Sequence, residues 1–418
     1  MHQHTAHSQH LPLQQRVLFV FPTLLAFLMP FGSAVLSWVI VFWTFVALMN
    51  YKLFKLQKFT RSIWFWSMPV FFVFTVVSAF FSNTISERGI AIEVKLSFVL
   101  FPFLFGGFSY PLDVLKRSAM AFVSGSFFAM IFLLARATYY TLQGESGYFY
   151  YTQFAGLMHA SYFAMYLLFA ISIIMLYYPV WFNKEPQVLK LSYFYLLLFV
   201  LGIILCASKL GLICFFLIFP FLVAYRLKDK FSIKKTLLIL AGFMVFAGVI
   251  LLNLPATKER IYNLTHVSSA TIDKATTEST AVRVLIWQQC VALIKEKPVL
   301  GHGVADANEA LYKSYADQGL TGAFTHKFNA HNQYFQTTIG MGVLGLIPLL
   351  CFTFFAMIVA LIQKHWLLFI LCTLFTLNFL VESMLQTAAG VIFVGYMYNF
   401  LLSFEYSHLS INHRASIT

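Results

Sequence analysis

Charged residues are scarce in this sequence. Asp, Glu, Lys and Arg make up 10% of the 418 residues, whereas hydrophobic residues make up 60%. A soluble globular protein carries about 25% charged and about 45–50% apolar residues. This deficit of charge excludes an ordinary soluble enzyme, a disordered chain and a nucleic-acid-binding protein that relies on a basic surface.

Cysteine is also rare and follows no pattern. The five cysteines are scattered along the chain without a CxxC pair, which excludes a disulfide framework and a cysteine-based metal site. Linkers rich in Gly and Ser, internal repeats and an appended soluble domain are also missing. We therefore expect one membrane domain with a single external insert.

Long apolar stretches fill the sequence instead. A membrane-spanning helix needs about 20 mostly apolar residues, and 49 Phe with 21 Tyr suit a lipid-facing surface with aromatic belts. The sequence predicts an all-α integral membrane protein with about 12 transmembrane helices. The predicted spans are 14–31, 33–50, 63–82, 90–108, 118–140, 157–180, 191–207, 210–225, 235–254, 334–361, 366–381 and 387–404.

The basic residues predict the orientation of these spans. Lys and Arg concentrate in alternate short connections, such as 52–61 and 226–235, whereas the opposite connections hold little beyond Arg88 and Lys209. Cytoplasmic loops carry the excess of positive charge in membrane proteins. We therefore expect both terminal tails, 1–13 and 405–418, in the cytoplasm.

One connection is long and differs in composition. Segment 255–333 lies between membrane segments 14–254 and 334–404, and it holds eight of the 28 basic and seven of the 15 acidic residues. The predicted orientation places it outside the cytoplasm. A loop of this length is expected to have its own structure and a function.

Helical periodicity within the loop predicts two helices. Apolar residues recur at helical spacing from Thr280 until Pro298. A second, short helix is expected after Asp306, with Glu309 three residues later as an analogue of a capping box and Gly319 as its end.

The sharpest motif lies where the loop returns to the membrane. His331 and Asn332 are followed by nine residues and then by Gly342-x-x-Gly345. A polar pair at this border can face a substrate at the membrane surface. The alternative is a polar helix start followed by glycines that let helices pack closely.

Two cations accompany this motif. Arg283 lies in the first loop helix, before Trp287 and a Pro-x-x-Gly-x-Gly segment, and Lys209 lies at the junction of spans 7 and 8. A cation between apolar spans is costly and marks a functional candidate. The alternative for Lys209 is that its side chain extends to the membrane surface.

Together these features resemble the O-antigen ligase family, which includes O-antigen polymerases and protein O-oligosaccharyltransferases. The resemblance rests on His-Asn, nine residues and Gly-x-x-Gly after a large external loop, on the loop arginine, and on twelve spans. It implies a bacterial inner-membrane enzyme of lipopolysaccharide biosynthesis with a periplasmic active site. The implied partners are membrane lipids, an undecaprenyl-pyrophosphate-linked oligosaccharide donor and a hydroxyl acceptor such as lipid A-core, without metal, cofactor or nucleic acid.

The resemblance also implies roles for three residues. His331 matches the catalytic histidine, Arg283 matches the arginine that contacts the donor pyrophosphate, and Lys209 stands where the family usually has arginine. Lysine keeps the charge but loses the planar fork suited to phosphate. Independently, a neutral imidazole, whose ordinary pKa is about 6.5, can take a proton from an acceptor hydroxyl, and fixed cations can stabilise a pyrophosphate leaving group.

Further residues are weaker candidates to line the site. Arg136 is a possible phosphate contact, and His159 with Tyr162 are possible acceptor contacts, although each also suits an interfacial position. Glu382 can orient His331 or pair with Arg283, or simply lie at the interface. Asn332 is a further candidate beside His331.

Other polar residues in the sequence do not point to a site. Glu93 and Lys95 are two positions apart, do not share a helix face, and are interpreted as interfacial. The loop histidines, including His302, His326 and His331, lack the spacing of a metal site.

The function predicted first is therefore en bloc transfer of a glycan to lipid A-core. Polysaccharide polymerisation and transfer to protein remain open as alternatives within the family. A transporter or flippase is the alternative of another class, since twelve spans are common there. Against it, we find no symmetric pair of Gly- or Pro-broken spans, which would indicate a transport site.

Overall fold

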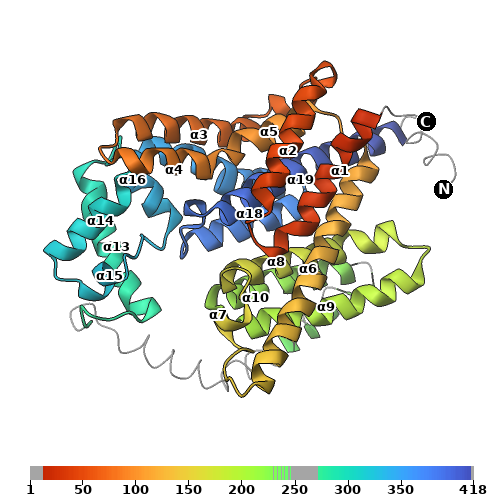
Figure 1. The fold of residues 1–418 in the computed structure, drawn as a ribbon. Helices are drawn as coiled ribbons and strands as arrows, with labels where there is room; N and C mark the ends of the chain where they lie inside the picture. Colours follow the sequence, from red (N-terminus) through yellow and green to blue (C-terminus); the bar gives the residue numbers. More distant parts are fainter. Residues whose placement is uncertain are drawn as a thin grey trace.

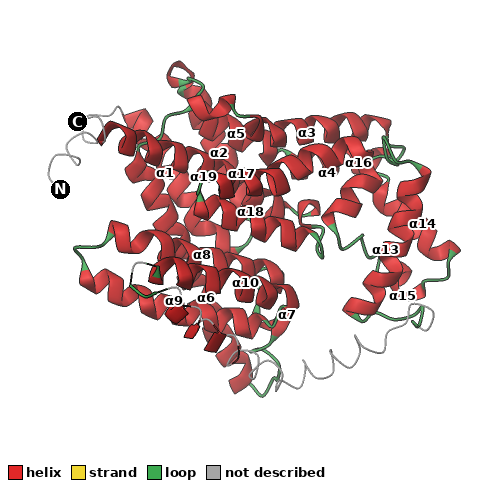
Figure 2. Ribbon diagram, turned by 180° about the vertical axis from the view of Figure 1, so that it is seen from behind, coloured by secondary structure: helices red, strands yellow, loops and turns green. Residues whose placement is uncertain are grey.

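The computed structural model describes residues 13–228, 230–232, 234–236, 238, 239, 241, 242, 245 and 272–415, and the regular secondary structure within them is entirely helical (Figures 1 and 2). The first helices are α1 Leu13–Leu28, α2 Leu36–Met49, α3 Ile63–Phe81, α4 Ile85–Lys95, α5 Ser97–Gly107, α6 Leu112–Leu142, α7 Tyr151–Phe154, α8 Ala160–Trp181, α9 Pro186–Cys206 and α10 Lys209–Leu227. After them come α13 Ser279–Glu296, α14 Ala307–Asp317, α15 Thr321–Thr325, α16 Gln333–Leu350, α17 Ala356–Ile362, α18 Trp366–Phe379 and α19 Ala388–Ala415. Short 3-10 turns lie at Met29–Phe31, Tyr51–Leu53, Lys58–Arg61 and Met384–Gln386, and a π-helical turn lies at Cys351–Phe355.

The prediction of an all-helical, polytopic membrane protein is confirmed. Among the described residues, seven helical segments are long and apolar enough to cross a membrane: Ile63–Phe81, Ile85–Gly107, Leu112–Leu142, Ala160–Trp181, Pro186–Cys206, Lys209–Leu227 and Gln333–Ile362. Shorter apolar helices cover Gln15–Phe31, Leu36–Met49, Trp366–Phe379 and Ala388–Phe404. The predicted span 235–254 lies largely outside the described residues.

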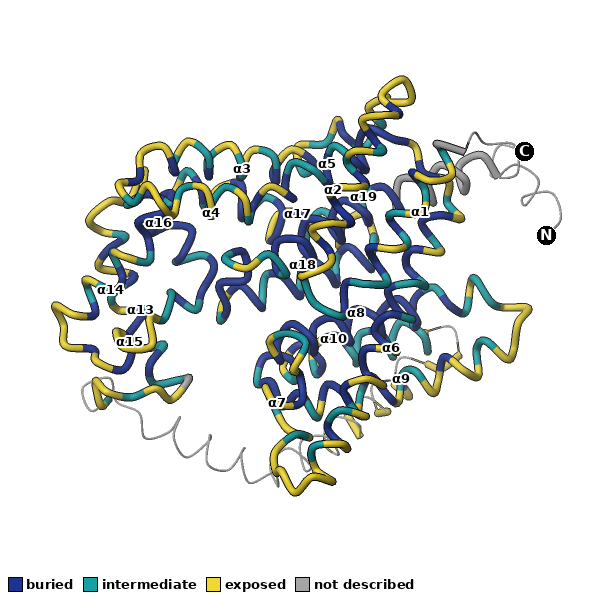
Figure 3. The backbone as a smooth tube through the Cα atoms, in the orientation of Figure 1, coloured by how far each residue is buried: buried dark blue, intermediate teal, exposed yellow. Residues whose placement is uncertain are grey.

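Helix α8 forms the centre of the bundle. It packs against α6, α9, α10 and α18, and 78% of its most apolar window is buried, against 28% for α9. Figure 3 shows the same contrast between a buried α8 and an exposed α9. Since apolar side chains on α9 remain exposed, that helix presents a surface suited to lipid.

Polar residues start several of the apolar helices. Side chains of His159, Ser208 and Asn332 accept backbone N–H groups at the beginnings of α8, α10 and α16. Such caps satisfy donors that have no partner within a helix. His159 and Asn332 were predicted to lie near the site, and Ser208 directly precedes the predicted Lys209, so these caps fix the backbone beside the candidate site residues.

Residues 272–332 form a small helical unit, called the loop unit below. Helices α13, α14 and α15 pack on one another and on α16, beside α3 and α4 (Figure 1). Their core contains Ile286, Leu311 and Tyr315 and continues into Ile339 of α16. Both predicted loop helices are therefore confirmed.

The predicted capping box in α14 is wrong. The Asp306 side chain makes no cap for its own helix; it accepts the backbone N–H groups of Asn83 at 2.6 Å and Thr84 at 2.8 Å. The Thr84 hydroxyl donates to Glu309 at 2.8 Å. Both carboxylates thus fasten the loop unit to the turn between α3 and α4.

The two glycines of the α16 motif do not mediate close packing of two membrane helices. Gly342 has φ +60° and ψ −163°, a non-helical conformation within α16, and a Cβ there would lie 2.0 Å from the Val299 carbonyl oxygen. Val343 N–H donates to the Pro298 carbonyl at 2.9 Å and Gly303 N–H to that of Gly340 at 3.0 Å. The helix opens at Gly342 to receive the loop segment 298–303.

Candidate active site

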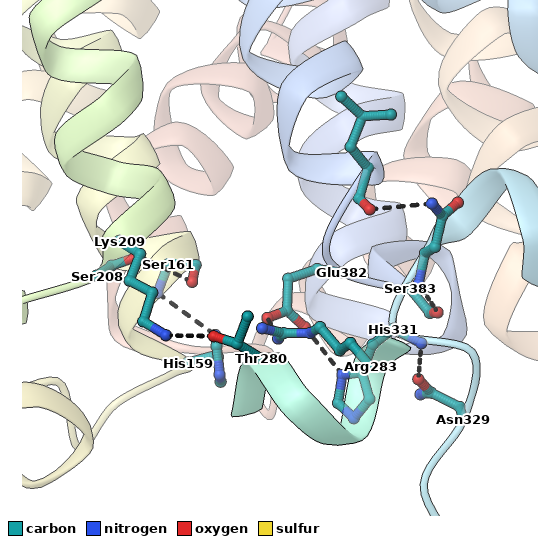
Figure 4. Close-up of polar contacts among 12 residues, drawn as sticks. His159, Ser161, Ser208, Lys209, Thr280, Arg283, Asn329, His331, Glu382 and Ser383 are labelled. Atoms are coloured by element: carbon teal, nitrogen blue, oxygen red, sulfur yellow. Dashed lines mark hydrogen bonds and ion pairs between the residues drawn. The ribbon is translucent and has the colours of Figure 1, made fainter. Parts of the chain in front are cut away.

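The first turn of α13 contacts Lys209. The Lys209 ammonium donates to the Thr280 hydroxyl at 2.6 Å and lies 3.6 Å from Oε1 of Glu278 (Figure 4). Glu278 caps α13 by accepting the backbone N–H groups of Thr280 and Ala281, each at 2.8 Å. Burial raises the pKa of the Glu278 carboxyl, but these N–H groups and Lys209 outweigh burial and hold it below its ordinary value.

Arg283 lies one helical turn further along α13 and contacts Glu382. Its Nη2 donates to Oε1 of Glu382 at 3.0 Å, and its Nε is buried without a hydrogen-bond partner among the described residues. Three residues along a helix advance about 4.5 Å on one side. The two predicted phosphate-binding cations are thereby linked through α13.

His331 approaches the same carboxylate from the other side. Its Nδ1 lies 3.7 Å from Oε2 of Glu382, an ion-pair distance longer than a direct hydrogen bond (Figure 4). The carboxylate therefore contacts both the candidate base and the candidate phosphate ligand. Among the predicted alternatives for Glu382, the structure has the contact with Arg283 and the contact with His331 together.

The backbone at His331 is fixed by short polar contacts. Its φ is +43°, in the left-handed region, and its N–H donates to the Asn329 side chain at 2.9 Å. Asn332 caps α16, while its own N–H donates to the Ser383 hydroxyl at 3.2 Å and its side chain to the Leu380 carbonyl at 3.0 Å. Asn332 is buried, so it positions its neighbours rather than lining a cleft.

The environment of Glu382 favours its ionised form. The residue is 8% exposed, and this burial raises its pKa, but the contact with His331 and the charges of His159 and Arg283 outweigh burial. The net pKa lies below the ordinary value. A partly buried carboxylate of this kind can hold a neighbouring imidazole and guanidinium in place.

The other predicted site residues divide into two groups. His159 precedes the first residue of α8 and lies close enough to Glu382 to lower the pKa of that carboxyl (Figure 4). The Tyr162 ring packs against the His159 ring, with the two centroids 5.5 Å apart. Arg136 instead donates to the Gln153 carbonyl at 3.0 Å and lies over the rings of Tyr140 and Tyr148. These contacts hold Arg136 against the segment that connects α6 with α8, rather than at the candidate site.

Sequence reasoning missed or misplaced several residues. The interpretation of Lys95 as interfacial is wrong: it is 2% exposed, at the end of α4, which packs against the turn Met384–Gln386. A lone lysine within an apolar stretch was the available signal. Thr280 and Glu278 were also missed, and only the helix start at Thr280 hinted at them.

The loop histidines do not gather into a cluster of metal ligands among the described residues. Within the described parts of the chain, no group of three or more His, Cys, Asp or Glu side chains is arranged to hold a metal ion. Nε2 of His302 forms a hydrogen bond with the Leu293 carbonyl at 2.9 Å, and Nδ1 of His326 forms one with the Gly322 carbonyl at 3.1 Å. The loop histidines thus have separate neighbours.

Comparison with known proteins identifies the region that contains these residues. No curated protein matches the chain. A family model described as O-antigen ligase matches residues 194–350, a segment that includes Lys209, Arg283 and His331. Members of this family are membrane enzymes that transfer lipid-linked glycans. Over residues 194–350, the chain is therefore similar to the O-antigen ligase family.

Proposed function

We propose that the protein transfers a glycan en bloc from undecaprenyl pyrophosphate to an acceptor hydroxyl, with lipid A-core as the leading acceptor. The observation that carries this proposal is the meeting of Arg283 and His331 on one carboxylate, Glu382. It joins a cation suited to phosphate and a base suited to a hydroxyl in one site.

His331 acts as the general base in this proposal. Its Nδ1 faces Glu382, so a proton on Nδ1 is favoured and Nε2 is left to accept the proton of the acceptor hydroxyl. As the acceptor oxygen bonds to the anomeric carbon, the bond from that carbon to the phosphate oxygen breaks. Attack from the opposite side inverts the anomeric centre.

Arg283 and Lys209 stabilise the departing undecaprenyl pyrophosphate. Each of them already contacts a carboxylate, at 3.0 and 3.6 Å, and a phosphate oxygen can take the place of a carboxylate oxygen in such contacts. The unpartnered Nε of Arg283 adds a further donor. Two fixed cations supply the charge stabilisation that makes the reaction metal-independent.

The position of these residues along their helices favours an enzyme over a transporter. Lys209 and His159 lie at the starts of α10 and α8, His331 immediately precedes α16, and Glu382 lies between α18 and α19. A transport site is expected near the middle of the membrane. Residues gathered at helix ends suit a donor whose lipid lies in the bilayer and whose sugar lies outside.

The proposed topology has twelve spans in the bacterial inner membrane, with cytoplasmic termini and a periplasmic site. Within the family, polymerisation of repeat units and transfer to protein are the alternatives. Incubating the purified protein with a lipid-linked oligosaccharide and each candidate acceptor distinguishes these alternatives. The acceptor that becomes glycosylated is lipid A-core for a ligase, a second donor molecule for a polymerase and a protein for an oligosaccharyltransferase. A transporter would move the donor between leaflets and glycosylate none of them.

The test of the base is His331→Gln, assayed with lipid A-core in the presence of EDTA. We expect transfer to fall by roughly 10²–10⁴-fold, the usual contribution of a general base, while the wild type is unaffected by the chelator. His326→Gln is the matched control, since His326 contacts a backbone carbonyl in the same loop unit. Full activity of the His331 variant would remove the proposed base, and inhibition by EDTA would point to a metal.

A further inference from the structure

A cavity lies away from the candidate active site. It has a volume of about 250 Å³ and lies between α8, α9 and α10. Apolar side chains such as Met175, Leu196 and Val223 form most of its wall, and Arg226 and Lys230 line it as well. No acidic residue is among the described side chains that line it.

This cavity belongs to the other end of the bundle. Arg226 follows Lys209 by 17 positions on α10, which corresponds to about 25 Å along a helix. The hydrocarbon core of a bilayer is about 30 Å thick. The cavity and the candidate active site therefore face opposite surfaces of the membrane.

We propose that this cavity binds the phosphate group of an anionic phospholipid. Arg226 and Lys230 provide positive charge beside an apolar wall, and basic pockets between membrane helices bind acidic lipid headgroups. Ligand pockets commonly measure about 300–1,000 Å³, so this smaller cavity takes the phosphate and the first methylene groups.

The lipid chains continue along the exposed surface of α9. Leu197 is 70% exposed and Ile204 is 50% exposed on that helix, and Tyr193 connects this surface with the cavity because it lines the cavity while also being largely exposed. A free phosphate ion would use the two cations alone. A phospholipid would use the cations and the apolar surface together.

Native mass spectrometry of the full-length protein tests the charge requirement, without any glycan donor. Phosphatidylglycerol should bind at least tenfold more tightly than phosphatidylcholine. The double variant R226Q/K230Q should weaken phosphatidylglycerol binding by about 25-fold, or about fivefold for each charge. K228Q is the matched control, because the Lys228 ammonium lies 4.3 Å from the Tyr225 ring centroid; it should retain at least half of the binding.

A second pair of variants tests the apolar part. Leu196→Trp fills the cavity and should abolish phosphatidylglycerol binding, whereas Leu48→Trp, at an exposed leucine of α2 that does not line the cavity, should not. Equal binding of the two lipids, or equal losses in K228Q and R226Q/K230Q, would overturn the proposal. Displacement of the lipid by an equal concentration of inorganic phosphate would replace it with a site for soluble phosphate.

Discussion

Arg283 and Glu382 are 99 positions apart in the chain, yet Nη2 of one lies 3.0 Å from Oε1 of the other. The second oxygen of Glu382 faces His331. One carboxylate thus connects a loop helix, the start of α16 and the turn between α18 and α19. In the proposed reaction, it sets the orientation of the base and of a phosphate ligand together.

Glu382→Gln should lower the kcat of transfer by about 10–100-fold, which corresponds to losing one hydrogen bond to a charged group. The side chain keeps its size but loses the charge that holds Arg283 and His331. Steady-state kinetics with a lipid-linked donor measure this. Glu93→Gln, which alters an exposed carboxylate, should leave kcat unchanged; a similar loss in both variants would argue against positioning by Glu382.

Thermal unfolding of the same variant should depend on pH. The pKa of Glu382 lies below its ordinary value of 4.5 in the folded protein, so the ionised carboxylate stabilises the fold above that value and loses this contribution as pH falls through the folded pKa. The difference in Tm between wild type and Glu382→Gln should be constant near neutral pH and shrink below about pH 4.5. A difference that grows on acidification would contradict this assignment.

Arg283→Ala should reduce kcat/KM for the donor by about 10²-fold, because hydrogen bonds to charged groups contribute about 1.5–3 kcal/mol each. Arg283→Lys should lose less, since it keeps the charge without the fork. Titration of donor concentration separates these cases. Lys295→Gln, at the other end of α13, is the control; equal kcat/KM for all variants would exclude Arg283 from donor binding.

Lys209→Arg should retain or increase turnover, and Lys209→Gln should lose about tenfold in kcat/KM for the donor. Arginine keeps the charge and adds the fork that the family usually has at this position. Parallel donor titrations compare the two variants. A severe loss in Lys209→Arg would mean that the contact with Thr280 matters more than the contact with phosphate.

Gly342→Ala should destabilise the protein by more than about 2 kcal/mol, because φ +60° with ψ −163° is accessible almost only to glycine and the new Cβ would collide with the Val299 carbonyl. A drop in Tm with loss of transfer is expected. Gly89→Ala is the control, as its Cβ would meet open space. An unchanged Tm in Gly342→Ala would show that the loop segment 298–303 can shift at little cost.

Much of the fold was predictable because apolar length and helical periodicity are local properties. The helix that begins at Ser279 follows directly from the apolar spacing after Thr280. The convergence of Arg283 and His331 was expected from the family resemblance rather than from spacing. Glu382 was predicted to contact one or the other of them, and the structure adds that it contacts both.

The failures share a physical cause. Asp306 has the sequence signature of a cap, but the N–H groups of residues 83 and 84 compete for its carboxylate. Gly342 lies in a helical pattern, but a loop packs into that helix. Lys95 has the sequence context of an interfacial residue, but it is buried at the end of α4, which packs against the turn at 384–386. Each outcome depends on a distant partner, which a single sequence does not reveal.

The hydrogen bonds of Asn332 and Gln333 have a consequence for the proposed reaction. They join residues 332 and 333 to Ser383 and Leu385. His331 and Glu382, which adjoin these residues, are therefore held together by local backbone contacts. The two proposed phosphate ligands, Lys209 and Arg283, come from α10 and α13, on either side of a long intervening stretch. In the proposed reaction, a change in the length of that stretch is therefore expected to alter the contacts with the lipid carrier more than the transfer of the proton.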